Sequence, residues 1–146
     1  MVKIIDKIKK IEDEKPNSPY FSFEYFPPKT EAGVENLYLR MERMTSLHPL
    51  FVDVTWGAGG ITKRLTMGIC EYSQKYFGTE VMMHLTCAGL PKEKLVEILQ
   101  EAKDAGITNI LALRGDPPKG AAAWKKHPSG VERAVDLVRL IKSEFG

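Results

Sequence analysis

Residues 80–118 read EVMMHLTCAGLPKEKLVEILQEAKDAGITNILALRGDPP, and they contain one complete strand–helix–strand unit. The runs at 80–87 and 108–115 are short and apolar, which is typical of buried strands. Residues 91–105 between them have helical spacing, with Pro91 in the first turn and Gly106 as the C-terminal stop. Because two strands joined through one helix run parallel, this stretch predicts a parallel α/β fold.

The rest of the chain repeats this unit. Further strands are predicted at 20–26 and 50–55, so successive strands start about 30 residues apart, the length of one strand–helix unit. Helical patterns cover residues 2–12, 31–47, 63–77 and about 130–144. Two architectures fit this alternation, an open doubly wound sheet and part of a closed (β/α)8 barrel.

Polar residues near the strand ends decide between these two architectures. An open sheet gathers its ligand groups mainly at one switch point, whereas a barrel receives them from every strand. Here every predicted strand carries at least one polar residue at or near its carboxyl end. In chain order these residues are Glu24, Thr55, His84 and Thr86, and Arg114 and Asp116. A barrel has eight units and this chain supplies four. We therefore expect residues 1–146 to form one domain, the first half of a TIM barrel preceded by a short helix.

Composition excludes several classes of function. The chain has 146 residues with 21 Lys and Arg against 19 Asp and Glu, and a net charge of +2 gives no strong electrostatic signal for a nucleic-acid partner. No apolar run approaches the roughly 20 residues that cross a membrane, and the N-terminus lacks the apolar core of a secretion signal. Two cysteines, Cys70 and Cys87, fit reduced thiols. We expect a cytoplasmic globular protein.

Glu24 is the first candidate for chemistry. It stands among aromatic residues in FSFEYF (21–26), where a carboxylate would lose hydration. Such burial favours the protonated form that a general acid needs. The alternative is a carboxylate at a strand end that faces water or pairs with a lysine such as Lys29.

LRGDPP (113–118) and TWGAGG (55–60) are the candidate ligand-binding loops. Arg114 can clamp a phosphate or carboxylate, Gly115 allows close approach of the backbone, and Asp116 can accept hydrogen bonds from a ring N–H. The alternative is a structural Arg–Asp turn. The glycines at 57–60 do not match the dinucleotide fingerprint, and a plain βα turn is the simpler interpretation. His84 is by default a core histidine, and the three histidines show no metal-ligand spacing, so no metal is assigned.

Together these motifs resemble one family. FSFEYFPPKT (21–30), FVDVTWGAGG (51–60), MHLTC (83–87) and NILALRGDPP (109–118) resemble the motifs of methylenetetrahydrofolate reductase in order and spacing. The resemblance covers essentially the whole chain and is closer to the eukaryotic branch. It implies a TIM-barrel flavoprotein of one-carbon metabolism. In this family NADH or NADPH reduces bound FAD, which then reduces 5,10-methylenetetrahydrofolate to 5-methyltetrahydrofolate; the eukaryotic likeness leans to NADPH.

The resemblance also implies roles for individual residues. Glu24 matches the general acid that opens the methylene bridge of the folate, and Asp116 matches the aspartate near the flavin and the folate pterin. Both are therefore expected at the catalytic and substrate-binding centre. The positions that match FAD contacts are Thr55, Trp56, Ala58, His84, Arg114 and Gly115, together with Asp116.

The family's barrel continues through four more units beyond the position matching Gly146. We therefore expect this chain to expose two strand edges and to associate through them, as a homo-oligomer or with a missing half. A second hypothesis follows, in which the chain is a catalytically inactive half-barrel fragment or assembly module derived from the enzyme.

Overall fold

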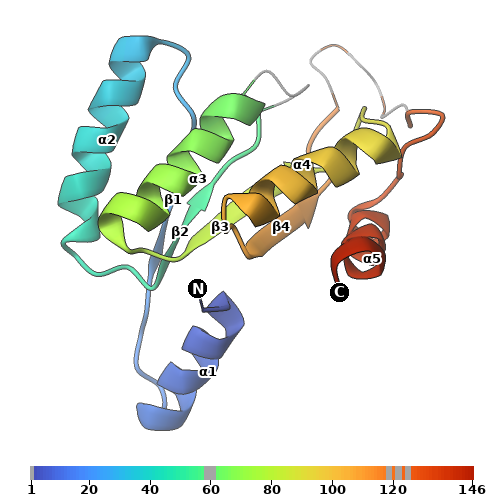
Figure 1. Cartoon of the computed structure of the whole chain (residues 1–146). Coiled ribbons are helices and arrows are strands. Elements are labelled where there is room, and N and C mark those ends of the chain that lie inside the picture. The colour runs from blue at the N-terminus through green and yellow to red at the C-terminus, as the bar shows by residue number, and fades with distance from the viewer. Residues whose placement is uncertain (1, 58–61, 118–119, 121–122, 124–125) are drawn as a thin grey trace.

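A computed structural model of the chain describes residues 2–57, 62–117, 120, 123 and 126–146. Five helices and four strands alternate along it (Figure 1). In chain order they are α1 (Ile4–Glu14), β1 (Ser22–Tyr25), α2 (Glu31–Thr45), β2 (Phe51–Val54), α3 (Lys63–Phe77), β3 (Val81–Thr86), α4 (Lys92–Asp104), β4 (Asn109–Leu113) and α5 (Ala134–Phe145). Every strand and helix predicted from the sequence is present.

The strands form one parallel sheet in the order β1-β2-β3-β4. The register aligns Glu24 of β1 with Asp53 of β2, and His84 of β3 with Leu111 of β4. Strand order therefore follows chain order without the reversal that defines a doubly wound sheet. This arrangement of alternating parallel strand–helix units is consistent with part of an α/β barrel.

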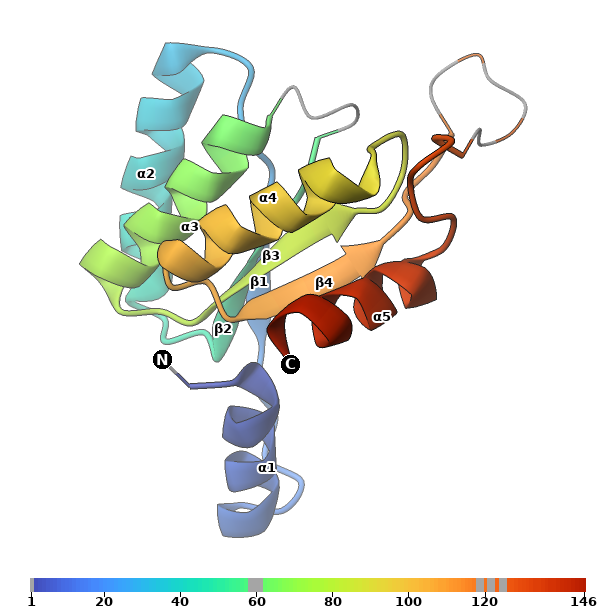
Figure 2. The same cartoon turned by 45° about the vertical axis from the view of Figure 1, so that its right-hand side comes forward.

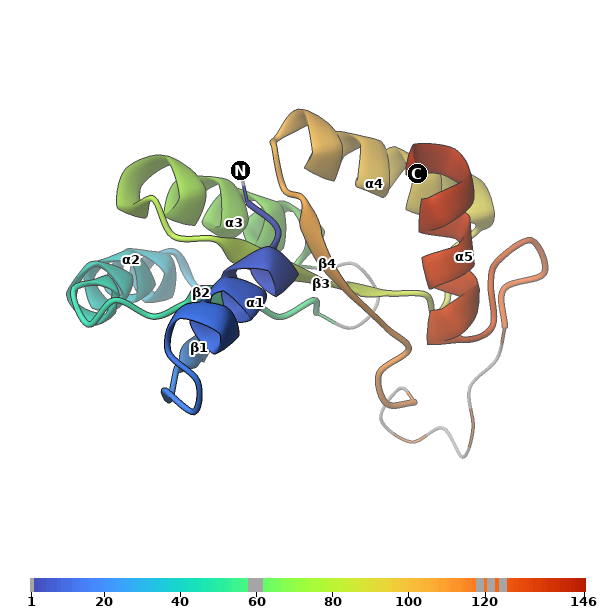
Figure 3. The same cartoon turned by 90° about the horizontal axis from the view of Figure 1, so that it is seen from below.

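Helices α2, α3, α4 and α5 all cover the same face of the sheet. The view from below shows them as an arc along the strands (Figure 3), and the turned view shows α5 running beside β4 (Figure 2). Strand alternation explains this packing, because every second residue points to the helices. Two apolar clusters fill that layer. One includes Val54, Ile69 and Met83, and the other includes Leu85, Leu95 and Leu137.

Helix α1 lies at the end of the sheet where the strands begin (Figure 1). Its N-terminus is fixed by a hydrogen bond from the Ile4 backbone N–H to the Asn109 side-chain oxygen, 2.9 Å long. The Lys7 ammonium donates to the Leu50 carbonyl at 2.6 Å. Ile4, Ile5 and Ile8 line a hollow with Phe51 and Met82 of the sheet. The helix thus closes the amino end of the uncovered sheet face, opposite the end where ligand groups were predicted.

Several helix boundaries differ from the sequence prediction by one to four residues, most at the start of the last helix. The last helix begins at Ala134, four residues later than residue 130, because the Asp136 carboxylate accepts a hydrogen bond from the Arg133 backbone N–H and caps the helix there. Among the described residues, no helix is both long enough and apolar enough to span a bilayer.

Candidate active site

The uncovered face of the sheet carries the candidate site. Glu24, Asp53 and His84 come from three neighbouring strands and point away from the helices, because the residues beside them in sequence are those packed in the core. The imidazole of His84 lies between the two carboxylates. Its Nε2 is 3.3 Å from Asp53 Oδ1, and its Nδ1 is 3.8 Å from Glu24 Oε1. The structure therefore brings the predicted acid and the predicted histidine together.

The expectation that aromatic neighbours bury Glu24 is wrong for this chain. Its side chain is 48% exposed. The physical reason is strand alternation: Phe23 and Tyr25 point into the helix-covered core, whereas Glu24 points to the opposite face. Glu24 is thus accessible to a ligand on the uncovered face, and it does not pair with Lys29 in any ion pair between described residues.

Asp53 is the functional candidate that sequence reasoning missed. It is 8% exposed and is the sole acidic side chain among the buried residues that the structure describes. A signal was present, since FVDV (51–54) has one charged residue in an otherwise apolar strand. The register of β1 and β2 supplies what the sequence does not show, because it places Asp53 directly beside Glu24.

The turn after β2 holds Thr55, Trp56 and Gly57. The Thr55 carbonyl accepts a hydrogen bond from the Thr66 hydroxyl at 3.0 Å, which ties the turn to α3. Gly57 N–H donates to the Thr62 hydroxyl at 2.6 Å, and a side chain at Gly57 would collide with Thr62. Glycine is therefore required here by close packing. Ala58, also predicted to contact a cofactor, lies outside the described residues.

Trp56 is partly buried against both apolar clusters. Its indole Nε1–H is buried and has no hydrogen-bond partner among the residues that the structure describes. A buried donor without a partner costs free energy, so this N–H is available to an acceptor that is absent from the chain. The predicted cofactor contact through Trp56 stays a prediction.

The segment after β4 places Arg114, Gly115 and Asp116 at the carboxyl edge of the sheet. The Thr86 hydroxyl donates to the Arg114 carbonyl at 2.8 Å and fixes the start of this loop. Gly115 has a φ of 74°, which L side chains rarely adopt. Arg114 and Asp116 are exposed, and their side chains form no ion pair with each other. No Arg114–Asp116 ion pair therefore supports the alternative of a structural turn.

The positive charge of Arg114 also acts on the neighbouring strand end. Burial raises the pKa of the Cys87 thiol, while a backbone hydrogen bond and the Arg114 guanidinium act in the opposite direction. Arg114 is thus close enough to stabilise a negative charge at the end of β3. A negatively charged ligand group at this edge would feel the same field.

Two groups of residues therefore lie at the site. Glu24, Asp53 and His84 form a cluster on the uncovered face, and Thr86 with Arg114–Asp116 forms the rim at the strand ends. Within the described part of the chain, no three His, Cys, Asp or Glu side chains are placed to hold a metal ion. The arrangement offers two carboxyl groups and an imidazole on the uncovered face, and a cation and a carboxylate at the strand ends, which are groups that suit a reaction on a polar organic substrate.

Comparison with known proteins agrees with this class of site. A family model described as methylenetetrahydrofolate reductase matches residues 7–146, so the chain belongs to that family. A relative from Arabidopsis thaliana, named methylenetetrahydrofolate reductase (NADH) 1, is 48% identical over 99% of this chain and 24% of its own length. Methylenetetrahydrofolate reductase 2 of Schizosaccharomyces pombe is 44% identical over 99% of this chain and 22% of its own length.

A third relative, from Caenorhabditis elegans, is named probable methylenetetrahydrofolate reductase (NADPH). It is 35% identical over 97% of this chain and 21% of its own length. The chain thus spans about a quarter or less of the length of these curated relatives.

Proposed function

We propose that this chain forms the first half of the catalytic barrel of a methylenetetrahydrofolate reductase. The reaction is reduction of 5,10-methylenetetrahydrofolate to 5-methyltetrahydrofolate by NADH or NADPH through FAD, in the cytoplasm. One observation carries the proposal: the Glu24 carboxyl lies exposed on the uncovered sheet face, 3.8 Å from His84, in a chain of this family. A scaffold protein has no need of that placement.

Glu24 acts as the general acid in this proposal. Opening the methylene bridge requires a nitrogen to leave carbon, and a nitrogen leaves more readily once it carries a proton. The Glu24 carboxyl supplies that proton from one of its oxygens. Its exposure allows the substrate to reach it, and the imidazole of His84 lies 3.8 Å away. Asp116 lies at the rim, where its carboxylate can accept a hydrogen bond from a ring N–H of the substrate.

The residues present fit a flavin dinucleotide. Gly115 has no side chain at the point where the loop turns. Arg114 is exposed and offers a guanidinium for a diphosphate. The indole N–H of Trp56, which has no partner among the described residues, can donate to an acceptor. When bound, FAD supplies the hydride transfer between the nicotinamide and the folate. Thr55, Trp56, Ala58, His84, Arg114, Gly115 and Asp116 would hold it. The names of the relatives support both NADH and NADPH as donors.

A second candidate function rests on the sheet edges. Strands β1 and β4 end the order β1-β2-β3-β4, so each has one strand neighbour among the described residues. Unpaired strand edges promote association. An inactive half-barrel that acts by assembly would use the same edges and would have no use for Glu24.

Half-reactions of a fusion protein test the first proposal against the second. Residues 1–146 replace the matching segment of the Arabidopsis relative, and the purified fusion is followed by flavin absorbance. We expect bound flavin to be reduced by NADH or NADPH and reoxidised by methylenetetrahydrofolate. A folded fusion that cannot be reoxidised by the folate would contradict the enzymatic function.

A further inference from the structure

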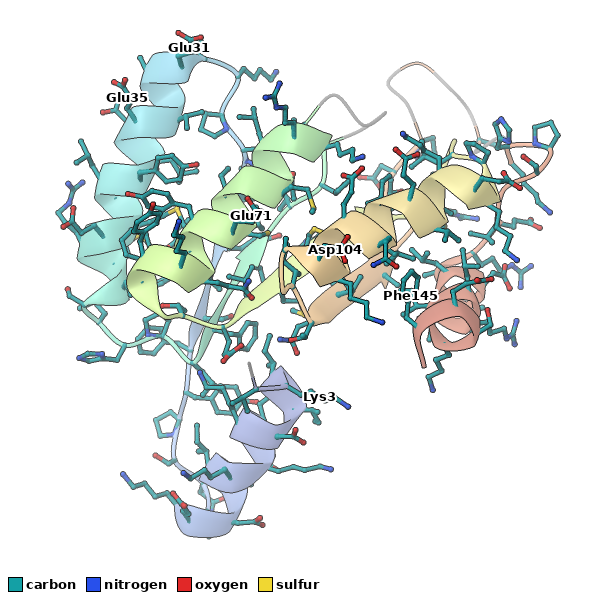
Figure 4. All side chains as sticks on the ribbon, viewed as in Figure 1. Lys3, Glu31, Glu35, Glu71, Asp104 and Phe145 are labelled. Carbon is teal, nitrogen blue, oxygen red and sulfur yellow. The ribbon has the colours of Figure 1, made fainter. Side chains whose placement is uncertain are left out.

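Asp53 is a carboxylate that the proposed chemistry has not yet used. It is 8% exposed in the middle of β2, whereas acidic side chains such as Glu31, Glu35, Glu71 and Asp104 project from the helices and are exposed (Figure 4). Burying a carboxylate is costly unless a hydrogen-bond donor compensates it. The compensating group must therefore be found among its neighbours.

His84 is that group. Its Nε2 lies 3.3 Å from Asp53 Oδ1, and both side chains are 11% exposed. The opposite ring nitrogen, Nδ1, faces Glu24 Oε1 at 3.8 Å. On the other side of His84, the register partner from β4 is Leu111, which cannot titrate. The charged groups that face the ring from β1 and β2 are thus Glu24 and Asp53.

The chemistry of the carboxylate decides where the ring carries its hydrogen. An ionised carboxylate only accepts hydrogen bonds, so His84 Nε2 must carry the hydrogen that points to Asp53. In the neutral ring Nδ1 then has no hydrogen and is an acceptor. Nδ1 therefore faces Glu24 Oε1, 3.8 Å away, with its lone pair and not with an N–H.

We propose that Asp53 is a positioning residue for the reaction. It fixes the tautomer and the orientation of the His84 ring beside Glu24; this inference rests on the proposed role of Glu24 as the general acid. Asp53 neither gains nor loses a proton. The proton that leaves Glu24 stays on the substrate nitrogen, and a proton from water restores the acid.

The tautomer of His84 can be measured without any ligand. The 146-residue chain is labelled with ¹⁵N, and long-range proton–nitrogen NMR spectra of the histidine rings are recorded for the wild type, Asp53→Asn and Asp13→Asn. We expect hydrogen on Nε2 in the neutral wild-type ring. An asparagine amide can donate to Nε2, so Asp53→Asn should move hydrogen toward Nδ1. Asp13 is exposed on α1, so its substitution should change nothing.

Hydrogen on Nδ1 in the wild type would overturn the proposal, and so would an unchanged tautomer ratio in Asp53→Asn. The wild-type measurement needs no variant, so the proposal stays falsifiable if Asp53→Asn fails to fold.

Kinetics of the fusion protein then test the consequence. General acid–base catalysis contributes roughly 100- to 10,000-fold to the rate, and a change in the orientation of His84 beside Glu24 should remove part of this contribution. We expect Asp53→Asn to lower kcat for folate reduction at least about tenfold with little change in KM, and to alter the pH profile of that half-reaction. Reduction of the flavin by the nicotinamide should be unchanged.

The two hypotheses fail in different ways. A wild-type fusion that never reduces folate would contradict the proposed function while leaving the tautomer measurement intact. A variant with an altered tautomer and wild-type folate reduction would overturn the positioning role alone.

Discussion

The sheet determines which side chains Glu24 and His84 can meet. The same alternation that buries Phe23 and Tyr25 turns Glu24 outward, beside an imidazole from β3. An exposed carboxyl that only faced water would need no such neighbour. The two groups of the proposed proton transfer therefore lie side by side on the uncovered face.

Replacing Glu24 by Gln separates binding from proton donation. In the fusion protein we expect Glu24→Gln to bind flavin and accept electrons from the nicotinamide normally. Folate reduction should fall by roughly 100-fold or more, because an amide has no acidic proton to give. Stopped-flow flavin absorbance measures both half-reactions. The matched control is Glu35→Gln, an exposed substitution on α2 (Figure 4). Normal folate turnover in Glu24→Gln would remove Glu24 from its role.

The sequence identified Glu24, His84 and the 114–116 loop because each breaks an apolar strand or ends one. It missed Asp53 for a physical reason. A charged residue within a strand gains meaning only once the register shows what lies beside it, and the pairs Glu24–Asp53 and His84–Leu111 appear only in the folded sheet. The exposure of Glu24 was misjudged because sequence neighbours in a strand point to opposite faces.

Among the elements, α1 is fixed by contacts that no local pattern specifies. The amphipathic spacing of its isoleucines predicts a helix, and it is one. Its place at the amino end of the sheet depends on Asn109 and the Leu50 carbonyl, which lie far away in sequence. Local periodicity thus predicted that α1 is a helix, whereas long-range polar contacts determine where α1 packs.

Removing the Asn109 side chain should loosen α1. Asn109→Ala deletes the acceptor for the Ile4 N–H, and we expect the free energy of unfolding to fall by about 1 kcal/mol. Urea denaturation followed by circular dichroism measures this change. Asn36→Ala on the exposed side of α2 is the control and should stay near the wild-type value. Equal stability of the two variants would show that the Asn109 contact does not hold α1.

At the scale of the whole molecule, the sheet has two edges and an uncovered face. Exposed aromatic residues accompany the β1 edge, with Phe21 47% and Phe26 67% exposed. Such edges and apolar surface favour association. We expect sedimentation velocity on the 146-residue chain to show species larger than the 16.4 kDa monomer, increasing with concentration. A monomer at all concentrations would contradict association through the edges.

The central claim is that these four units carry a flavin-dependent reductase site. An FAD titration of the fusion protein, followed by flavin absorbance and fluorescence, tests it most directly, with Arg114→Ala as the comparison. We expect saturable binding by the wild type and weaker binding by the variant, because the guanidinium that attracts the diphosphate is lost. A folded fusion protein that binds no FAD would contradict a flavin site in these four units.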